Sequence, residues 1–413
     1  MKRPLTVFAL VPFACAMAAA ADWNQWRGPL RNGVVLKSPA LADSWGESGP
    51  VKVWESEPIS NNRQGYGSVA VAGGKAYLYV NWKYQVPVTL SSDVAKKHAD
   101  TISPDVEVIG TDVVLCLDAA DGKTLWRFEQ KSRSDYSGGS STPCVVDGRV
   151  YVLGSDADLY CLDAKAGSEI WQRKLGTGVK HTSVAVVDGT VIAAVGPLTA
   201  LKAETGETLW EQEGVPNTEA SPAIWRSGGH SYLLCNSKKD LSCVNLSDGS
   251  IAWTVPGGNS SSAAVSGDHM VVYTGPKGLG LAAYTLTPST AEQIWAIERP
   301  NGESSPIIYE GHVYAVGGQQ ASCVDLSSGE IKWQVDVTTD MTSPVVADGK
   351  IISASVKSLT MFAATPEKYT LLGSANPPVG QCVSPAIADG KLYMRMGPGV
   401  LCYDLKVDPG ESL

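Results

Sequence analysis

The chain has 413 residues, of which 18% are charged, and it contains 42 glycines, 24 prolines and 12 tryptophans. This composition is typical of a turn-rich globular protein with a large core, and it excludes a disordered chain. The formal net charge of −9 makes nucleic acid and anionic membrane surfaces poor partners. Beyond residue 21 there is no run of about 20 apolar residues, so we expect no transmembrane segment.

The first 21 residues have the organisation of a signal peptide. Lys2 and Arg3 precede an apolar stretch, residues 5–17, and residues 18–21 are small alanines suited to cleavage. We therefore expect export to the periplasm or the extracellular space, with the mature chain beginning near Ala21 or Asp22. Cys15 raises the alternative of a lipoprotein, but Pro12 stands where a lipid-attachment motif has Leu. A buried N-terminal helix is the remaining alternative.

Short turn-bounded strands recur through the chain, and residues 305–333 show them most clearly. Gly, Asp and Ser mark the joints of one antiparallel meander. A single sheet of this kind cannot bury both of its faces, so it requires copies of itself. The predicted strands of this copy are Pro306–Tyr309, His312–Val316, Ala321–Asp325 and Glu330–Val335.

The second half of each copy has a fixed spacing: Cys or Ala, then Asp two residues later, Gly six later and Trp ten later. A period near 40 residues with four strands per unit predicts a β-propeller. We expect the Trp on the outer strand to pack against the neighbouring blade. The spacing is clearest from Cys116 to Trp126, Cys161 to Trp171, Ala200 to Trp210, Cys243 to Trp253 and Cys323 to Trp333.

The first half of each copy occurs eight times, but the last copy stops after its third strand. Residues 51–57, with Trp54 at the repeat position, have the form of the missing strand. We therefore predict an all-β, eight-bladed propeller of four-stranded antiparallel blades over residues 22–413, in which an N-terminal strand closes the last blade. Such closure removes exposed sheet edges. Residues 22–50 are the N-terminal segment that precedes this strand.

Blade one carries a long insertion, residues 83–110. We expect the second strand to end at Asn81-Trp82 and the third to begin near Thr111–Val114, with a short helix at Ser92–Ala99. Long loops in a compact repeat are usually functional or disordered. A ligand or partner role for the insertion and a decorative one remain open.

Five cysteines occupy one repeat position, two residues before the turn Asp or Asn. Equivalent positions of different blades lie beyond the roughly 7 Å that a disulfide spans between Cα atoms, so we expect small buried apolar side chains. The pairing of Cys144, Cys235 and Cys382 is left open. The five repeat cysteines are Cys116, Cys161, Cys243, Cys323 and Cys402.

These D-x-x-x-G-x-x-x-W half-repeats resemble the pyrroloquinoline-quinone-like (PQQ-like) propeller repeat family over nearly the whole mature chain. Trp23–Gly33, WNQWRGPLRNG, resembles the N-terminal segment of exported bacterial members. The resemblance implies either a quinone-dependent alcohol dehydrogenase or a non-enzymatic scaffold, such as the outer-membrane barrel assembly subunit. The dehydrogenases are expected to hold quinone on Ca²⁺, with a vicinal disulfide, a stacking Trp and a catalytic Asp. This chain has no adjacent cysteines, and none of its Asp residues matches the catalytic one by motif.

One residue per blade should meet at the mouth of the central channel. Two carboxylates beside amide and imidazole groups could ligate Ca²⁺ or do acid–base work. A solvated polar funnel is the simpler interpretation, and we favour it over ligand binding, and ligand binding over catalysis. Aligning the eight first strands on a shared Gly gives Tyr66, Ser140, His181, Glu219, Asn259, Glu303, Met341 and Cys382, with Arg63, Gln64, Asp135, Tyr136, Lys180 and Asp340 in flanking loops.

From these residues we predict an exported, monomeric, non-catalytic propeller that binds a protein or small ligand at its loop-rich face. Its binding residues would be Arg63, Tyr66, Lys180, His181, Glu219, Asn259 and Glu303, and no catalytic residue is assigned.

The alternative is an oxidoreductase that depends on PQQ and Ca²⁺ and acts on an alcohol or sugar. Glu219, Asn259 and Glu303 would then lie near the metal, and Lys180 or Arg63 near the quinone carboxylates.

The cluster at Trp23–Gly33 also permits two interpretations. A platform of stacked Trp and Arg for nucleic acid or glycan is conceivable. We favour a structural segment whose Arg side chains pair with the acidic propeller surface and whose Trp side chains cover an open blade edge.

Overall fold

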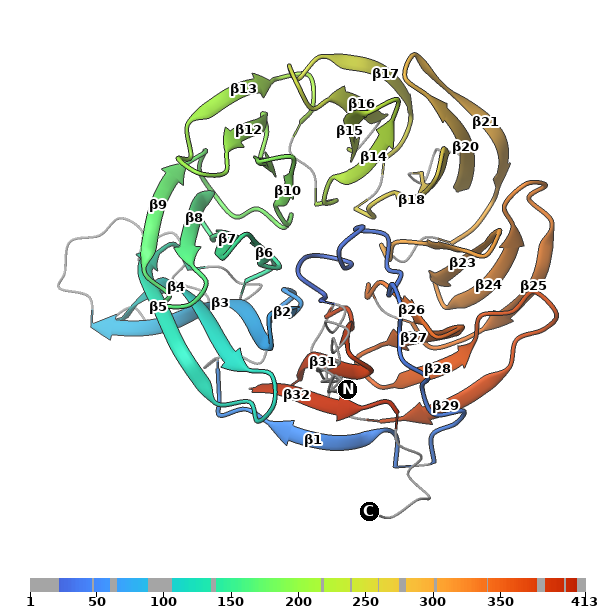
Figure 1. The fold of residues 1–413 in the computed structure, drawn as a ribbon, viewed down its shortest axis with the longest axis horizontal. Helices are drawn as coiled ribbons and strands as arrows, with labels where there is room; N and C mark the ends of the chain where they lie inside the picture. The colour runs from blue at the N-terminus through green and yellow to red at the C-terminus, as the bar shows by residue number, and fades with distance from the viewer. Residues whose placement is uncertain are drawn as a thin grey trace, which may run out of the picture.

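A computed structural model shows a ring of eight four-stranded antiparallel sheets, coloured around the circle in chain order (Figure 1). The predicted eight-bladed β-propeller is therefore confirmed. The described residues contain no helix of the length and apolar character that a membrane crossing requires. The structure describes residues 22–46, 48–59, 65–87, 106–134, 139–216, 219–237, 240–258, 260–274, 280–300, 303–339, 341–376, 383–396 and 399–406.

Each blade runs from a short inner strand beside the channel to an outer strand at the circumference, and consecutive strands pair in order. Blades one and two comprise β2 (Ala70–Ala72), β3 (Lys75–Pro87), β4 (Val106–Asp118), β5 (Thr124–Ser132), β6 (Cys144–Val146), β7 (Arg149–Leu153), β8 (Asp158–Asp163) and β9 (Glu169–Lys174). Blades three and four comprise β10 (Ala185–Val187), β11 (Thr190–Ala194), β12 (Leu198–Lys202), β13 (Thr208–Gln212), β14 (Ala223–Ser227), β15 (His230–Asn236), β16 (Asp240–Asn245) and β17 (Ile251–Pro256).

The second half of the ring repeats the same order. Blades five and six comprise β18 (Ala264–Ser266), β19 (His269–Tyr273), β20 (Leu281–Thr287), β21 (Thr290–Ile297), β22 (Ile307–Tyr309), β23 (His312–Gly317), β24 (Gln320–Asp325) and β25 (Ile331–Asp336). Blades seven and eight comprise β26 (Val345–Ala347), β27 (Lys350–Ala354), β28 (Leu359–Ala363), β29 (Leu371–Ala375), β30 (Ala386–Ala388), β31 (Lys391–Met396), β32 (Gly399–Asp404) and β1 (Val51–Glu55).

The N-terminal strand β1 closes the ring, as predicted. It pairs antiparallel with β32, with Val51 opposite Asp404 and Glu55 opposite Leu401. Trp54 is buried, and its indole N–H donates to the carbonyl of Ala119 in blade one at 3.1 Å. The strand therefore completes blade eight and joins it to blade one.

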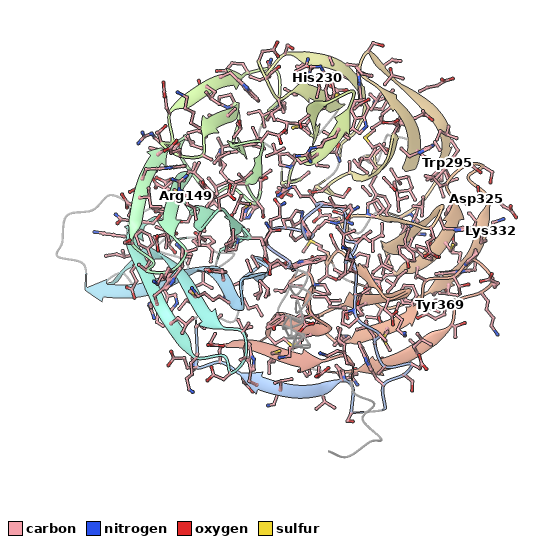
Figure 2. All side chains as sticks on the ribbon, in the orientation of Figure 1. Arg149, His230, Trp295, Asp325, Lys332 and Tyr369 are labelled. Atoms are coloured by element: carbon pink, nitrogen blue, oxygen red, sulfur yellow. The ribbon has the colours of Figure 1, made fainter. Side chains whose placement is uncertain are left out.

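The repeat tryptophans join each blade to the next. The Trp126 indole N–H donates to the Ala164 carbonyl at 3.2 Å, and a Cβ added to Gly167 would meet the Trp126 ring at 2.5 Å. Gly at this turn therefore gives both the positive φ and the space for the ring. Trp295, which packs the same way, lies toward the outside of its blade (Figure 2). The same contact occurs in the pairs Trp54–Gly122, Trp171–Gly206, Trp210–Gly249 and Trp295–Gly329.

Blade seven lacks a Trp at this position, and the N-terminal segment replaces it. Gly373 pairs with Met361 in the register that Trp333 has with Cys323 in blade six. Trp45 lies against this glycine, because a Cβ on Gly373 would meet the Trp45 Cβ at 2.6 Å. The Trp45 amide also donates to the Leu372 carbonyl. An aromatic side chain from outside the repeat thus covers the blade.

Residues 22–35 occupy the central channel, where Figure 1 shows the dark blue segment inside the ring. Their hydrogen bonds reach inner strands around the circle. Trp23 exchanges backbone hydrogen bonds with Val71 of blade one, and the Val346 amide of blade seven donates to the Gly33 carbonyl. In blade two, the Asn24 side chain donates to the Val145 carbonyl at 2.9 Å.

Two arginines of this segment are buried, with 3% of Arg27 and 2% of Arg31 exposed. We expected ion pairs with the acidic surface, and this was wrong. Arg31 donates to the carbonyls of Val184 and Pro222 at 2.9 and 2.7 Å, and Arg27 donates to that of Pro306. The partners are carbonyls because the segment lies inside the channel, where inner strands expose unpaired backbone. Burial lowers the pKa of both arginines, yet guanidinium remains protonated at neutral pH.

The blade-one insertion is partly strand, which differs from our expectation. β3 and β4 pair continuously from Lys75–Asp118 to Pro87–Val106, so both extend into the range assigned to the insertion. Tyr and Val have a high preference for β-strands. Each of the two strands has thirteen residues, and their pairing continues past the last residue of β4 that pairs with β5. The predicted helix at Ser92–Ala99 lies outside the described residues.

The repeat cysteines are buried and unpaired, as expected. Burial raises their pKa, to about 12 for Cys161 and Cys243, so these thiols stay protonated and unreactive at neutral pH. Cys144 and Cys235 are also buried and free, while Cys382 lies outside the described residues.

Removing the Arg31 side chain should destabilise the propeller. Arg31→Ala removes the donor to three carbonyls beside the inner strands, those of Ser183, Val184 and Pro222, and leaves a void in the channel, so we expect the free energy of unfolding to fall by about 3 kcal/mol or more. Urea unfolding followed by tryptophan fluorescence measures the change. The control is Arg226→Ala, which removes an exposed ion pair with Asp188 and should cost less than about 1 kcal/mol. Equal losses in the two variants would contradict a structural role for the channel arginine.

Candidate functional site

A cavity of about 330 Å³ lies at one mouth of the channel, and we call it the cup. Its rim consists of the residues that precede the inner strands, which the repeat places at equivalent points of the ring. Most members of the predicted ring line it, so the geometric expectation is met there. The rim residues that line the cup are Tyr66, Ser140, His181, Glu219, Ser260, Glu303 and Met341.

Below the rim, a belt of Ser and Thr residues joins the blades. From Ser68 to Ser343, the backbone N–H of each belt residue donates to the hydroxyl of the belt residue in the next blade, with donor–acceptor distances from 2.9 to 3.1 Å. These bonds satisfy backbone donors that the inner strands leave unpaired. At the seam between blades eight and one, the Ser68 hydroxyl has no partner within the described part of the chain. In ring order the belt is Ser68, Thr142, Ser183, Ser221, Ser262, Ser305, Ser343 and Ser384.

The N-terminal segment forms the floor of the cup. Trp26 lines the cavity, and its indole N–H lies 3.4 Å from the hydroxyl of Ser262 in the belt. Arg31 lies beneath the belt, where it donates to the Ser183 carbonyl. The cup is therefore closed below by the chain itself and is continuous with solvent at its rim.

Two glutamates give the rim its electrostatic character. The Ser260 hydroxyl donates to Glu219 Oε2 at 2.7 Å and fixes that carboxylate. Partial burial, together with the negative charge of Glu219, raises the pKa of Glu303 above its ordinary value, although the side chain stays largely open to solvent. Glu303 also has a φ of +61°, a conformation unfavourable for a side chain other than Gly or Asn. The raised pKa and the positive φ of Glu303 each lower the stability of the folded protein.

On the other side of the rim, Ser140 and His181 are linked. The Ser140 hydroxyl lies 2.8 Å from His181 Nδ1, and the imidazole tautomer decides which group donates. This bond holds the imidazole at the cavity edge. His181 has the hydrogen-bonded turn role that a lone His most often has.

In blade five, the ring position belongs to Ser260 and not to Asn259, which corrects our alignment. In blade seven the turn between the first two strands is Asp348-Gly349, whereas in blade five it is Gly267-Asp268. Aligning on the Gly therefore shifted blade five by one residue. Asn259 itself lies outside the described residues.

Of the other predicted site residues, the structure describes Lys180. Lys180 is half-buried beside His181 but is not among the described residues that line the cavity. The remaining predicted residues lie outside the described part of the chain: Arg63, Gln64, Asp135, Tyr136, Asp340 and Cys382.

Sequence reasoning missed Trp26 and the belt. The sequence contains a pattern that predicts the belt, because a Ser or Thr follows most ring residues by two positions. Trp26 had only the resemblance of its segment to exported propellers, and nothing local placed it inside the channel.

The described lining of the cup does not fit a bound PQQ. The quinone carries several carboxylates, but the charged residues among the described lining are Glu219 and Glu303, and Lys or Arg side chains are not found there. Among the described residues, no group of three His, Cys, Asp or Glu side chains is placed to hold a metal ion. Two carboxylates with hydroxyl, thioether and indole neighbours favour positive charge over negative.

The sequence and fold were compared with known proteins. A family model described as "Outer membrane protein assembly factor BamB" matches residues 110–256 and 238–368. An outer membrane protein assembly factor BamB of Moranella endobia is 26% identical over 252 residues, which are 58% of this chain and 56% of that protein. A tetrathionate hydrolase of Acidithiobacillus ferrooxidans is 22% identical over 332 residues, 72% of this chain and 64% of that protein. The chain thus spans about three-fifths of the length of these relatives.

A solved structure resembles the fold. The quinohemoprotein alcohol dehydrogenase ADHIIG of Pseudomonas putida HK5 aligns with a TM-score of 0.63, covering 95% of this chain and 82% of that one. The sequence identity is 13%, so the likeness concerns the fold alone.

Removing the charge of Glu219 should lower the pKa of Glu303. In Glu219→Gln the repulsion is gone while burial remains, so the pKa should fall but stay above the ordinary value for Glu. NMR of ¹³C-labelled glutamate carboxyls measures it, and Glu310→Gln, which changes an exposed carboxylate at the other end of β22, is the control. An unchanged pKa in Glu219→Gln would show that the two carboxylates do not interact.

The raised pKa of Glu303 also makes the stability of the protein depend on pH. Because the pKa of Glu303 is raised by folding, its favourable contribution is present below the unfolded pKa and is lost as pH rises through the folded pKa. Glu303→Gln should therefore be more stable than wild type above that pKa and show no such advantage below it, which thermal melts across the pH range would record.

Proposed function

Because the chain belongs to the family of propellers described as outer membrane protein assembly factor BamB, we propose that it is a non-catalytic propeller that binds a partner protein at its cup-bearing face. The family match confirms the resemblance to PQQ-like repeat proteins. The observation that carries the proposal is the N-terminal segment, which fills the channel and closes the cup from below. A closed cup on a rigid ring suits recognition of a group presented from outside.

The leader-like features of residues 1–21 support a periplasmic or extracellular location. The description "assembly factor" names a role in bringing other proteins together, which supports a protein partner over a small ligand. We propose a monomer, because the ring closes on itself through β1 and needs no second chain for closure.

The second candidate is a PQQ- and Ca²⁺-dependent oxidoreductase, favoured by the likeness to the quinohemoprotein fold. It would use Glu219 and Glu303 at the metal, with Asn259, and Lys180 or Arg63 at the quinone carboxylates. The carboxylate-bearing lining of the cup argues against it, since a multiply anionic quinone would meet like charges.

Calorimetry and an activity assay separate the two candidates. Titrating the protein with PQQ in the presence of Ca²⁺ should give no heat of binding at micromolar concentration. Incubation with alcohols or sugars and a dye acceptor should give no turnover. Binding accompanied by dye reduction would refute the scaffold proposal, and the same titration of Glu219→Gln/Glu303→Gln would show whether the carboxylates hold the metal.

Crosslinking tests the partner directly. A photoreactive side chain in place of Tyr66 at the rim should give a defined protein adduct in the native host. The control position is Asp325, which is half-buried and lies toward the outside of blade six (Figure 2). Adducts of equal yield at both positions, or none at the rim, would contradict a partner on this face.

A further inference from the structure

The belt serines beneath the rim present hydroxyl protons to the cup. Each of their oxygens accepts a backbone N–H from the preceding blade, and this bond leaves the O–H proton available. Within the described part of the chain, no acceptor lies within hydrogen-bonding distance of these protons. Because a buried donor without an acceptor is unfavourable, the belt is prepared for a group that accepts several hydrogen bonds. The five belt hydroxyls that line the cavity, on residues between 1% and 5% exposed, belong to Ser183, Ser221, Ser262, Ser305 and Ser343.

The rim of the cup offers the opposite kind of group. Glu219 lines the same cavity, and its Oε2 accepts the Ser260 hydroxyl at 2.7 Å. A carboxylate has about four lone-pair positions, so Glu219 can accept further hydrogen bonds after this one. The cup therefore combines donors at the belt with an acceptor at the rim, and a guest that satisfies both levels must itself donate and accept.

This requirement selects the chemical class of the guest. An ammonium or guanidinium group only donates, so it leaves the belt protons without acceptors. A carboxylate or phosphate group only accepts, so it offers no proton to Glu219. A hydroxyl group does both, and a ring that carries several hydroxyls presents them in different directions at fixed geometry. A sugar ring thus matches a cavity with five belt donors and a carboxylate acceptor.

The size and the floor of the cup also suit a sugar ring. The volume, about 330 Å³, is near the lower end of the roughly 300–1,000 Å³ of small-molecule pockets. Trp26 closes the cup from below, with its indole N–H 3.4 Å from the Ser262 hydroxyl, so a guest enters from the rim. The indole offers apolar surface to the C–H groups of a sugar. Water also donates and accepts hydrogen bonds, but it leaves this apolar surface in contact with solvent.

We propose that the cup binds one ring of a neutral saccharide. The belt serines donate to its oxygens, Glu219 accepts from one of its hydroxyls, and Trp26 covers its apolar face. The structural bonds of the belt are retained, because they engage the serine oxygens while the guest takes the protons. The inference goes beyond the proposed scaffold function: the ring is either a free sugar or the terminal residue of a glycan that a partner carries.

Free methyl glycosides test the site on the wild-type protein. The probes are the methyl glycosides of glucose, galactose, mannose and N-acetylglucosamine, and the control is cyclohexanol, a six-membered ring with a single hydroxyl. Saturation-transfer NMR and tryptophan fluorescence measure binding. We expect at least one glycoside to bind with a Kd of about 1 mM or below, and cyclohexanol to give no signal. Deoxy analogues that lack a hydroxyl facing the belt should bind about fivefold more weakly.

Variants of the belt locate the binding, and the belt supplies its own matched control. Ser221→Ala removes a hydroxyl that lines the cup, whereas Ser384→Ala removes one that accepts the same kind of N–H but is not among the described lining residues. Both variants lose one structural bond and should lose similar stability in urea unfolding, while only Ser221→Ala should bind the sugar about fivefold more weakly. Trp26→Leu should weaken binding by about tenfold. Circular dichroism establishes that each variant folds, and the deoxy analogues supply the same information on the wild-type protein.

An array of surface-linked glycans distinguishes the two sources of the sugar. Binding of the free glycosides shows that the ring alone is recognised, whereas binding on the array alone shows that the ring is recognised as part of a glycan, and the variants are then measured on the array.

Three results would overturn the proposal: no binding to any glycoside or glycan, undiminished binding of every deoxy analogue, or equal affinity in Ser221→Ala and Ser384→Ala. Each would show that the belt protons donate to ordered water only. These failures are separable from failure of the scaffold function. A rim crosslink to a protein without glycan binding would reject the sugar alone, whereas quinone-dependent dye reduction would reject the scaffold.

Discussion

Backbone hydrogen bonding at the inner edge of the blades determines how this propeller is built. An inner strand pairs on one side with the next strand of its blade, and its other side faces the channel. Buried backbone groups left without partners there would cost about 1–3 kcal/mol each. Belt hydroxyls accept the N–H groups, and Arg31 and Asn24 donate to carbonyls. The channel segment therefore supplies polar groups that satisfy the strands, in addition to apolar side chains such as Trp23.

The N-terminal segment meets that requirement and shapes the rest of the molecule. The same stretch that enters the channel continues outward, places Trp45 over Gly373 of blade seven and ends as β1 of blade eight. Its Trp26 becomes the floor of the cup. Channel filling, ring closure and the depth of the binding cavity thus depend on one segment, so the site is coupled to the stability of the fold.

The sequence predicts the parts of this structure that the repeat expresses locally. The sequence predicts four features correctly: the repeat period, the turn glycines, the outer tryptophans and the closing strand. Each of them follows from spacing within one blade or from a missing strand. The parts that failed depend on distant contacts or on turn detail. The carbonyl partners of Arg31 belong to blades three and four, far away in sequence. The predicted ring residue of blade five was one position before Ser260. The alignment used the turn glycine, and Gly267 takes the first turn position, which Asp348 takes in blade seven.

The contrast between belt and rim shows where function can reside in a repeat protein. Belt positions are occupied by Ser and Thr, and from Thr142 to Ser384 each hydroxyl accepts an N–H from the preceding blade. Two residues earlier, the rim positions differ from blade to blade and carry phenol, imidazole, hydroxyl, carboxylate and thioether groups. Glu219 and Glu303 face one cavity there, although their repulsion raises the pKa of Glu303 and its φ is unfavourable. A strained backbone conformation of this kind persists only where the surrounding structure maintains it, and such conformations gather at functional sites.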